Sequence, residues 1–131
     1  MPTMRSYLAG NRTACIPLLT ASLASSGFMQ PVVAERIIVT ELGLAAPDLL
    51  VLDIDDLDTD PLELLRMMRF VLPTCIIAVY SGTLRQSWAL SCHLAGANCI
   101  LSKSSDEAQI AAGLRQALTS GCFTDPSFIA A

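Results

Sequence analysis

Short apolar runs and segments with helical periodicity alternate along the whole chain. Five runs have the length of strands, at residues 5–9, 31–34, 49–52, 75–80 and 99–101. Apolar side chains recur at helical spacing after each run, which predicts helices over residues 13–26, 35–44, 61–71, 84–95 and 106–119. Because crossover connections are right-handed, such an alternation packs as a parallel sheet with helices on both faces. The pattern therefore predicts an α/β fold with a five-stranded, doubly wound parallel sheet and five helices.

Prolines and glycines mark the limits of most of these elements. Pro17 falls in the first turn of a predicted helix, where proline is tolerated, and Gly27 follows its end. The predicted helix over residues 35–44 is the least regular of the five. It contains the β-branched run Ile-Ile-Val-Thr at 37–40, which is equally compatible with an extended conformation.

The composition fits one compact domain without a nucleic-acid surface of its own. The 131 residues are 53% hydrophobic and 15% charged, with a net charge of -4. This balance offers no basic field for phosphate groups, so direct DNA binding is not expected. The chain shows no signal-peptide pattern at its start, and its apolar runs are shorter than the roughly 18 residues that span a bilayer. We expect a cytoplasmic protein that does not enter a membrane.

The five cysteines show no pattern typical of a metal or redox centre. They are scattered, no two form a CxxC pair, and the chain has a single histidine, His93. We expect the cysteines to be small buried hydrophobic residues. They are Cys15, Cys75, Cys92, Cys99 and Cys122.

Polar residues follow the predicted strands directly. Asn11, Asp53, Ser81 and Lys103 each stand at the carboxyl end of a strand, and ligands of open parallel sheets bind at that edge. The stretch PDLLVLDIDDLDTD (47–60) also carries five aspartates in its last eight residues. A solvated acidic loop that caps the next helix is the alternative interpretation, and it is kept for Asp56, Asp58 and Asp60.

Three motifs resemble those of the receiver domains of bacterial two-component response regulators, especially the LuxR/NarL type. PDLLVLDID resembles the third-strand motif with the phosphate-accepting aspartate, which falls on Asp53. AVYSG resembles the fourth-strand motif with the switch hydroxyl at Ser81, and LAGANCILSK leads to the lysine position at Lys103. The resemblance covers residues 4–128 and implies a flavodoxin-like strand order.

The chemistry that the resemblance implies is phosphoryl transfer from the phosphohistidine of a histidine kinase. The charge that develops on the phosphoryl oxygens has to be neutralised by a divalent cation, an ammonium and a hydroxyl or amide donor. Lys103, the only lysine of the chain, would supply the ammonium. Ser81 would supply a hydroxyl that moves onto a phosphoryl oxygen and shifts the following loop.

The metal-binding positions depart from the family pattern. Receivers usually hold Mg2+ with two acidic residues at the end of the first strand, and here those positions read Gly10-Asn11. Mg2+ prefers carboxylates and water, so Asp53, Asp55 and Asn11 form only a degenerate set of ligands. Asp55 would compensate in part. We expect Mg2+ to bind weakly or not at all.

Two further positions depart from the pattern. The usual Pro and Gly after the phosphorylation site are replaced by Leu57, Asp58 and Pro61, and the fifth strand carries Ile100 where a switching Tyr or Phe is common. An isoleucine cannot alternate between a buried and a hydrogen-bonded exposed position as a tyrosine does. We therefore expect an atypical receiver, not an enzyme, with impaired or absent phosphorylation. A receiver that is phosphorylated on Asp53 is the alternative, and a small α/β enzyme or nucleotide binder is a remote one.

The resemblance also implies partners. Receivers of this type dimerise through the fourth and fifth helices with the last strand, and GCFTDP resembles the point where they enter a linker to an output domain. We expect a receiver domain at 1–121, a tail or linker at 122–131, and DNA binding only through an output domain outside this chain. The expected surface of the homodimer comprises Trp88, Cys92, Ile110, Leu114 and Leu118.

Overall fold

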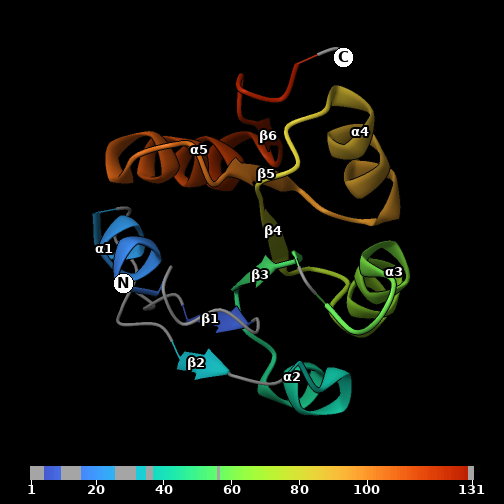
Figure 1. The fold of residues 1–131 in the computed structure, drawn as a ribbon. Helices are drawn as coiled ribbons and strands as arrows, with labels where there is room; N and C mark the ends of the chain where they lie inside the picture. Colours follow the sequence, from blue (N-terminus) through green and yellow to red (C-terminus); the bar gives the residue numbers. More distant parts are fainter. Residues whose placement is uncertain (1–4, 10–15, 26–31, 35–36, 56, 130–131) are drawn as a thin grey trace.

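A parallel sheet with helices on both faces forms the centre of the computed structural model (Figure 1), which describes residues 5–9, 16–25, 32–34, 37–55 and 57–129. Its strands are β1 (Ser6–Ala9), β2 (Val32–Ala34), β3 (Leu49–Asp53), β4 (Ile76–Ser81), β5 (Cys99–Ser102) and β6 (Phe123–Thr124). Its helices are α1 (Ile16–Ser25), α2 (Val39–Ala45), α3 (Pro61–Val71), α4 (Gln86–Ala95) and α5 (Glu107–Ser120). In the part of the chain that the structure describes, no helix is long and apolar enough to span a membrane.

The strand order is β2-β1-β3-β4-β5-β6, and every neighbouring pair is parallel. The order reverses between β1 and β3, which is the doubly wound arrangement predicted from the sequence. The register places Asp53 opposite Tyr80 and Ser81 opposite Ser102. Asp53, Ser81 and the residue after Ser102 therefore meet at one edge of the sheet.

The two faces of the sheet are covered by different helices. Figure 1 shows α1 and α5 on one face and α2, α3 and α4 on the other. Alternate side chains of the central strands enter the two layers: Leu50 and Leu52 pack with α3 and α4, whereas Leu49 and Val51 pack with α1 and α5. All five side chains of β3 are buried, as expected for a central strand covered on both sides.

Capping residues explain where two helices begin. The Asp60 side chain accepts a hydrogen bond from Leu62 N at 3.0 Å, and Pro61 occupies the first turn of α3. Asp106 and Gln109 form a reciprocal capping box at the start of α5. Asp60 is thus the residue of the acidic loop that caps α3.

Helix α2 starts later than its sequence pattern indicated. It begins at Val39, and Ile38 before it is extended, with φ -114° and ψ 105°. Residues 35 and 36 lie outside the described part of the chain. The β-branched run thus divides between an extended segment and the first turn of the helix, in keeping with the χ1 restriction of its side chains.

A sixth strand corrects the expected strand count. After Gly121, which has φ 84° and ends α5, the chain turns back and β6 pairs with the edge of β5. Phe128 beyond it is only 6% exposed, and Ile129 forms a β-bridge with Arg85. The sheet therefore extends past the expected boundary after residue 121, because Phe123 and Thr124 pair with β5.

Candidate functional site

Asp53 and Lys103 form an ion pair at the carboxyl edge of the sheet. Asp53 is the last residue of β3 and is 5% exposed, and Lys103 directly follows β5. Lys103 Nζ lies 2.9 Å from Asp53 Oδ1. The backbone N–H of Asp55 donates to the same oxygen at 3.1 Å. One oxygen of Asp53 thus has both a charged and a backbone donor.

The carboxylate of Asp55 receives hydrogen bonds from three different donors. Ser81 Oγ donates to Asp55 Oδ1 at 3.0 Å, and Gly82 N donates to Oδ2 at 2.9 Å. Lys103 Nζ lies 3.0 Å from Oδ2. The end of β4, the loop after it and the residue after β5 therefore all contact one side chain from the loop after β3.

The pKa values in the site reflect this mutual stabilisation. Burial by itself raises the pKa of Asp55, but the hydrogen bonds from Gly82, Lys103 and Ser81 together bring it below the ordinary value of an aspartate. Burial acts to lower the pKa of Lys103, and its bonds to Asp53 and Asp55 outweigh this effect and raise the pKa. The pair Asp55 and Lys103 is therefore fully charged at neutral pH.

Asp53 Oδ2 differs from the other carboxylate oxygens of the site. It is buried and has no hydrogen-bond partner among the residues that the structure describes. Such an atom fits a bound cation or a bond to an incoming group. Both oxygens of Asp55, however, already accept hydrogen bonds, so within the described part of the chain Asp53 Oδ2 is the one oxygen of these two aspartates without a hydrogen bond.

One free carboxylate oxygen does not make a magnesium site, because Mg2+ needs an octahedral set of oxygen ligands, usually with one or two carboxylates and several waters. The described residues contain no group of three or more His, Cys, Asp or Glu side chains that could hold a metal ion. The third predicted ligand, Asn11, and its neighbour Gly10 lie outside the described residues. The described part of the site therefore does not fit a tightly held Mg2+.

The local geometry of Ser81 and Lys103 adds contacts that the sequence did not indicate. Ser81 Oγ accepts a hydrogen bond from Thr83 N at 3.1 Å while it donates to Asp55, so its proton position is defined. Lys103 Nζ lies 5.5 Å from the centroid of the Tyr80 ring, which is a cation–π distance. Both functional groups are held by more than one neighbour. The backbone N–H of Gly82 belongs to the site too, and sequence patterns do not reveal backbone donors.

The other predicted positions lie apart from this cluster. Asp58 is exposed, Asp60 caps α3, and Asp56 is outside the described residues. Ile100 is 0% exposed and packs with the α2–α4 layer of the core. The position where receivers commonly carry a switching aromatic residue is thus filled by a fixed core side chain.

Three of the five residues expected at a dimer surface are buried in the core. Cys92, Ile110 and Leu114 are at most 1% exposed, because they point into the two core layers. Trp88 and Leu118 are half-buried and pack against the same layers. Three of the five side chains are therefore not available to a partner in this conformation.

Three of the cysteines match the expectation of buried hydrophobic residues, and one does not. Cys75, Cys92 and Cys99 are buried, whereas Cys122 is exposed, because it lies in the turn between α5 and β6. Cys15 lies outside the described residues. Burial raises the pKa of both Cys75 and Cys92 to about 12.

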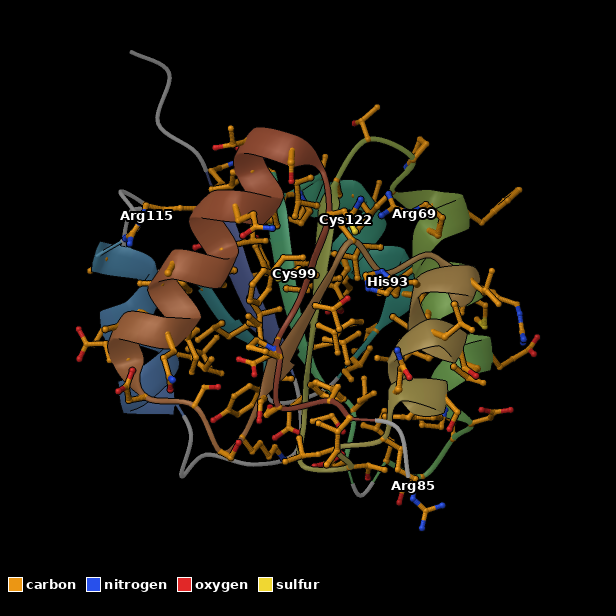
Figure 2. All side chains as sticks on the ribbon, turned by 90° about the horizontal axis from the view of Figure 1, so that it is seen from above. Arg69, Arg85, His93, Cys99, Arg115 and Cys122 are labelled. Carbon is orange, nitrogen blue, oxygen red and sulfur yellow. The ribbon has the colours of Figure 1, made fainter. Side chains whose placement is uncertain are left out.

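His93 links α4 to the C-terminal strand β6. Its Nδ1 lies 2.9 Å from the Ala97 carbonyl and its Nε2 lies 2.7 Å from Thr124 Oγ1. Figure 2 shows its ring pointing from α4 toward the middle of the molecule, whereas Arg85 points away from it. His93 therefore has a structural role in holding β6.

The strand order, the two helical layers and the cluster of Asp53, Ser81 and Lys103 define the class of fold: the chain has the fold of response-regulator receiver domains. A response regulator from Thermotoga maritima is similar, with a TM-score of 0.78 at 18% identity over 90% of this chain and 99% of that one. No protein-family model and no curated protein matches the sequence of the chain.

Two further solved structures show how widely this fold is used. A LuxR-family two-component response regulator from an Aurantimonas species has a TM-score of 0.75 at 20% identity, over 97% of this chain and 93% of that one. A protein assigned to pilus assembly from Burkholderia thailandensis has a TM-score of 0.73 at 16% identity, over 89% of this chain and 99% of that one. Identities at this level establish the fold and leave the function to the site.

Proposed function

We propose that the chain is an atypical receiver domain, which regulates an output by protein contact and is phosphorylated on Asp53 weakly or not at all. The observation that carries the proposal is the arrangement around Asp55. The three groups that would stabilise a phosphoryl group on Asp53, namely Ser81 Oγ, Gly82 N and Lys103 Nζ, already bind the Asp55 carboxylate. Gly10-Asn11 and Ile100 support the same conclusion from the sequence.

In this proposal the chain is a regulatory module and not an enzyme. It works in the cytoplasm as part of a two-component system or a pathway derived from one, and it forms homodimers. The proposed output is transcription, through a DNA-binding domain outside this chain, because the GCFTDP segment resembles the end of LuxR/NarL-type receivers. The pilus-assembly neighbour has the same fold, so the fold by itself does not select this output.

Ordinary phosphorylation of Asp53 by a histidine kinase is the second candidate, and Asp53 Oδ2 favours it. This buried oxygen has no hydrogen bond from any of the described residues, so it is free to accept a phosphoryl group. In that case Asp55 would have to leave the three donors before the phosphoryl group could be stabilised. The two candidates differ in whether the wild-type domain binds a phosphoryl mimic.

The test is the melting temperature of the domain with millimolar Mg2+ alone and with Mg2+ and beryllofluoride, a mimic of a phosphoryl group on aspartate. A ligand that binds the native state raises the melting temperature by mass action. We expect no shift beyond that of an Asp53→Asn variant, which serves as the control for non-specific effects of the additives. A clear rise in the wild type that is absent from Asp53→Asn would contradict the proposal and establish the second candidate.

A further inference from the structure

A groove lies between the start of α2, the loop before α3 and the first half of α3. The two helices are neighbours in one layer over the sheet (Figure 1). The volume of the groove is about 490 Å³, and pockets that hold ligands typically measure about 300–1,000 Å³. The apolar side chains that line it are Ile37, Val39, Leu57, Leu64 and Met67. An apolar lining of this size can receive several side chains of a partner.

A second hollow of about 300 Å³ continues from the groove toward the end of α3. Val39 and Met67 line both hollows, and Phe70 lines the second one. Met67 is 48% exposed and Phe70 is 87% exposed. Both project from the same side of α3, because residues three apart in a helix are neighbours on its surface. The two hollows therefore form one apolar surface, which we call the α2–α3 groove.

Acidic side chains line the end of the α2–α3 groove that lies at the start of α3. They are Asp58, Asp60 and Glu63, and all three residues are exposed. Among the described residues, Arg66 is the only cation that lines either hollow, and its ion pair with Glu63 is more than half exposed. Capping and the helix dipole account for Asp60 and Glu63 at this position, but not for Asp58, which precedes the helix. The groove thus has an acidic end at the start of α3 and an apolar end at Phe70.

The charges at the acidic end select one class of occupant. A second copy of the chain would bring two such ends into one interface if the same faces met, and like charges in an interface disfavour association. A membrane surface of anionic lipids would be repelled in the same way. A segment with Lys or Arg at one end and apolar side chains at helical spacing matches both ends of the groove.

We propose that the α2–α3 groove docks a basic amphipathic helix of a partner protein, with its cations against the acidic end and its apolar side chains against Met67 and Phe70. The stretch of α3 from Asp60 to Phe70 is about 15 Å long, so a helix of roughly ten to twelve residues covers it. Met67 suits this role, since methionine adapts its shape to different apolar partners. The inference rests on the proposed function for its meaning in signalling, because it gives the proposed regulation by protein contact a surface.

The experiment selects peptides on the wild-type domain from a phage-displayed library of random sequences of about twelve residues, the length that covers the groove. The most enriched peptides are synthesised with a fluorescent label, and fluorescence anisotropy gives their affinities for the wild type and for variants. Met67→Ser and Phe70→Ser remove apolar contacts. A double variant, Asp58→Asn with Glu63→Gln, removes two of the acidic groups. Asp60 is left unchanged because it caps α3.

Two control variants change the same kinds of side chain outside the groove. Leu94 on α4 is 80% exposed and lines neither hollow, so Leu94→Ser is the control for a lost apolar side chain. Glu107 on α5 is exposed and belongs to the layer on the other face of the sheet, so Glu107→Gln is the control for a lost charge. Urea unfolding of every variant checks that the domain is folded.

We expect the enriched peptides to carry a net positive charge and apolar residues at helical spacing. Met67→Ser and Phe70→Ser should each weaken binding by about tenfold or more, as the truncation of a central anchor does. The double acidic variant should also weaken binding, by an amount that shrinks as sodium chloride is added. Leu94→Ser and Glu107→Gln should leave the affinity within about twofold of the wild type.

Three results would overturn the inference. One is a library from which no peptide is enriched. The second is a set of enriched peptides that are neutral or acidic, or that bind Met67→Ser and Phe70→Ser as tightly as the wild type. The third is another occupant: a wild-type dimer that Met67→Ser dissociates in sedimentation would assign the groove to a second copy, and binding to phosphatidylserine vesicles that Met67→Ser abolishes would assign it to a membrane. None of these measurements uses Mg2+ or beryllofluoride, so a failure of the inference and a failure of the proposed function can be told apart.

Discussion

The ring of Phe123 lies directly against the backbone of Gly113, in the middle of α5. A Cβ atom at position 113 would lie 2.8 Å from Cδ2 and 2.9 Å from Cζ of that ring. Gly113 is buried and helical, so glycine is required here by the space that Phe123 occupies and not by backbone conformation. The absence of a side chain on α5 thus lets β6 approach the helix and pair with β5.

Gly113→Ala is expected to loosen β6 and to destabilise the domain by about 1–2 kcal/mol. Overpacking typically costs about 1–3 kcal/mol, and the better helix propensity of alanine offsets up to about 1 kcal/mol. The matched control is Gly43→Ala in α2, where the new Cβ would lie 3.4 Å from Val71 Cβ in ordinary contact. Urea unfolding gives the two stabilities, and amide exchange at Phe123 reports on the strand. An equally stable Gly113→Ala domain with a protected Phe123 amide would contradict this account.

The stability contributed by Asp55 is expected to depend on pH in a definite direction. Because its pKa is lower in the folded than in the unfolded state, the contribution is complete above the ordinary aspartate pKa of about 4 and is lost as pH falls through the lowered value. Asp55→Asn should therefore cost about 1 kcal/mol at pH 7 and progressively less as the pH falls below about 4 and through the lowered pKa. Denaturant unfolding across this range measures the difference.

Asp58→Asn is the control for the pH experiment, since this carboxylate lies on the surface of the same loop. Its effect should stay within about 0.5 kcal/mol at every pH, as is usual for exposed positions. If Asp55→Asn showed the same small and pH-independent effect, the hydrogen bonds to Ser81, Gly82 and Lys103 would contribute nothing to stability.

Arg69 holds together the loop between α3 and β4 and the loop between α4 and β5, at the end of the sheet opposite the site, and Figure 2 shows it at the end of α3. Its guanidinium donates to the carbonyls of Leu72 and Cys75 at 2.9 Å and to that of Gly96 at 3.0 Å. Arg69→Ala would remove one donor from each of these three carbonyls, and we expect the free energy of unfolding to fall by about 2–4 kcal/mol. Arg66→Ala on the same helix is the control; its ion pair is largely exposed and should contribute less than about 0.5 kcal/mol. Thermal unfolding of the two variants separates these outcomes.

The cysteines are expected to react with iodoacetamide at very different rates. Cys122 is exposed, whereas Cys75 and Cys92 are buried and have pKa values raised to about 12, so they hold almost no thiolate at pH 8. Pulsed alkylation with peptide mass spectrometry should therefore label Cys122 first and the other two only on unfolding. Rapid labelling of Cys92 in the native protein would show that α4 separates from the sheet.

Most of the fold could be predicted because its signals are local. The runs at β3 and β4 are apolar and have the length of strands, and glycines end α4 and α5. These elements can therefore be predicted from the apolar pattern and from the residues that end helices. Strand β6 could not be predicted in this way. It has only two residues, and it is a strand because these residues pair with the edge of β5 and because the Phe123 ring fits against Gly113.

The position of the site could be predicted from the sequence, but the hydrogen bonds within it could not. Strand ends bring Asp53, Ser81 and Lys103 together in any parallel sheet of this order, so their proximity follows from topology. The role of Asp55 depends on where its side chain points, which the loop after β3 decides. The sequence suggested a metal ligand there, and the structure places its oxygens on three donors instead.

Strand β6 also limits how chains of this protein can associate through their backbones. The outermost strands of the described sheet are β2 and β6, with three and two residues. A sheet edge recruits another chain when it offers a long row of unpaired N–H and C=O groups, and β5 would offer such a row without β6. By pairing with Cys99 and Ile100, the C-terminal segment shields the hydrophobic centre of β5 from the strand-to-strand growth that leads to aggregates.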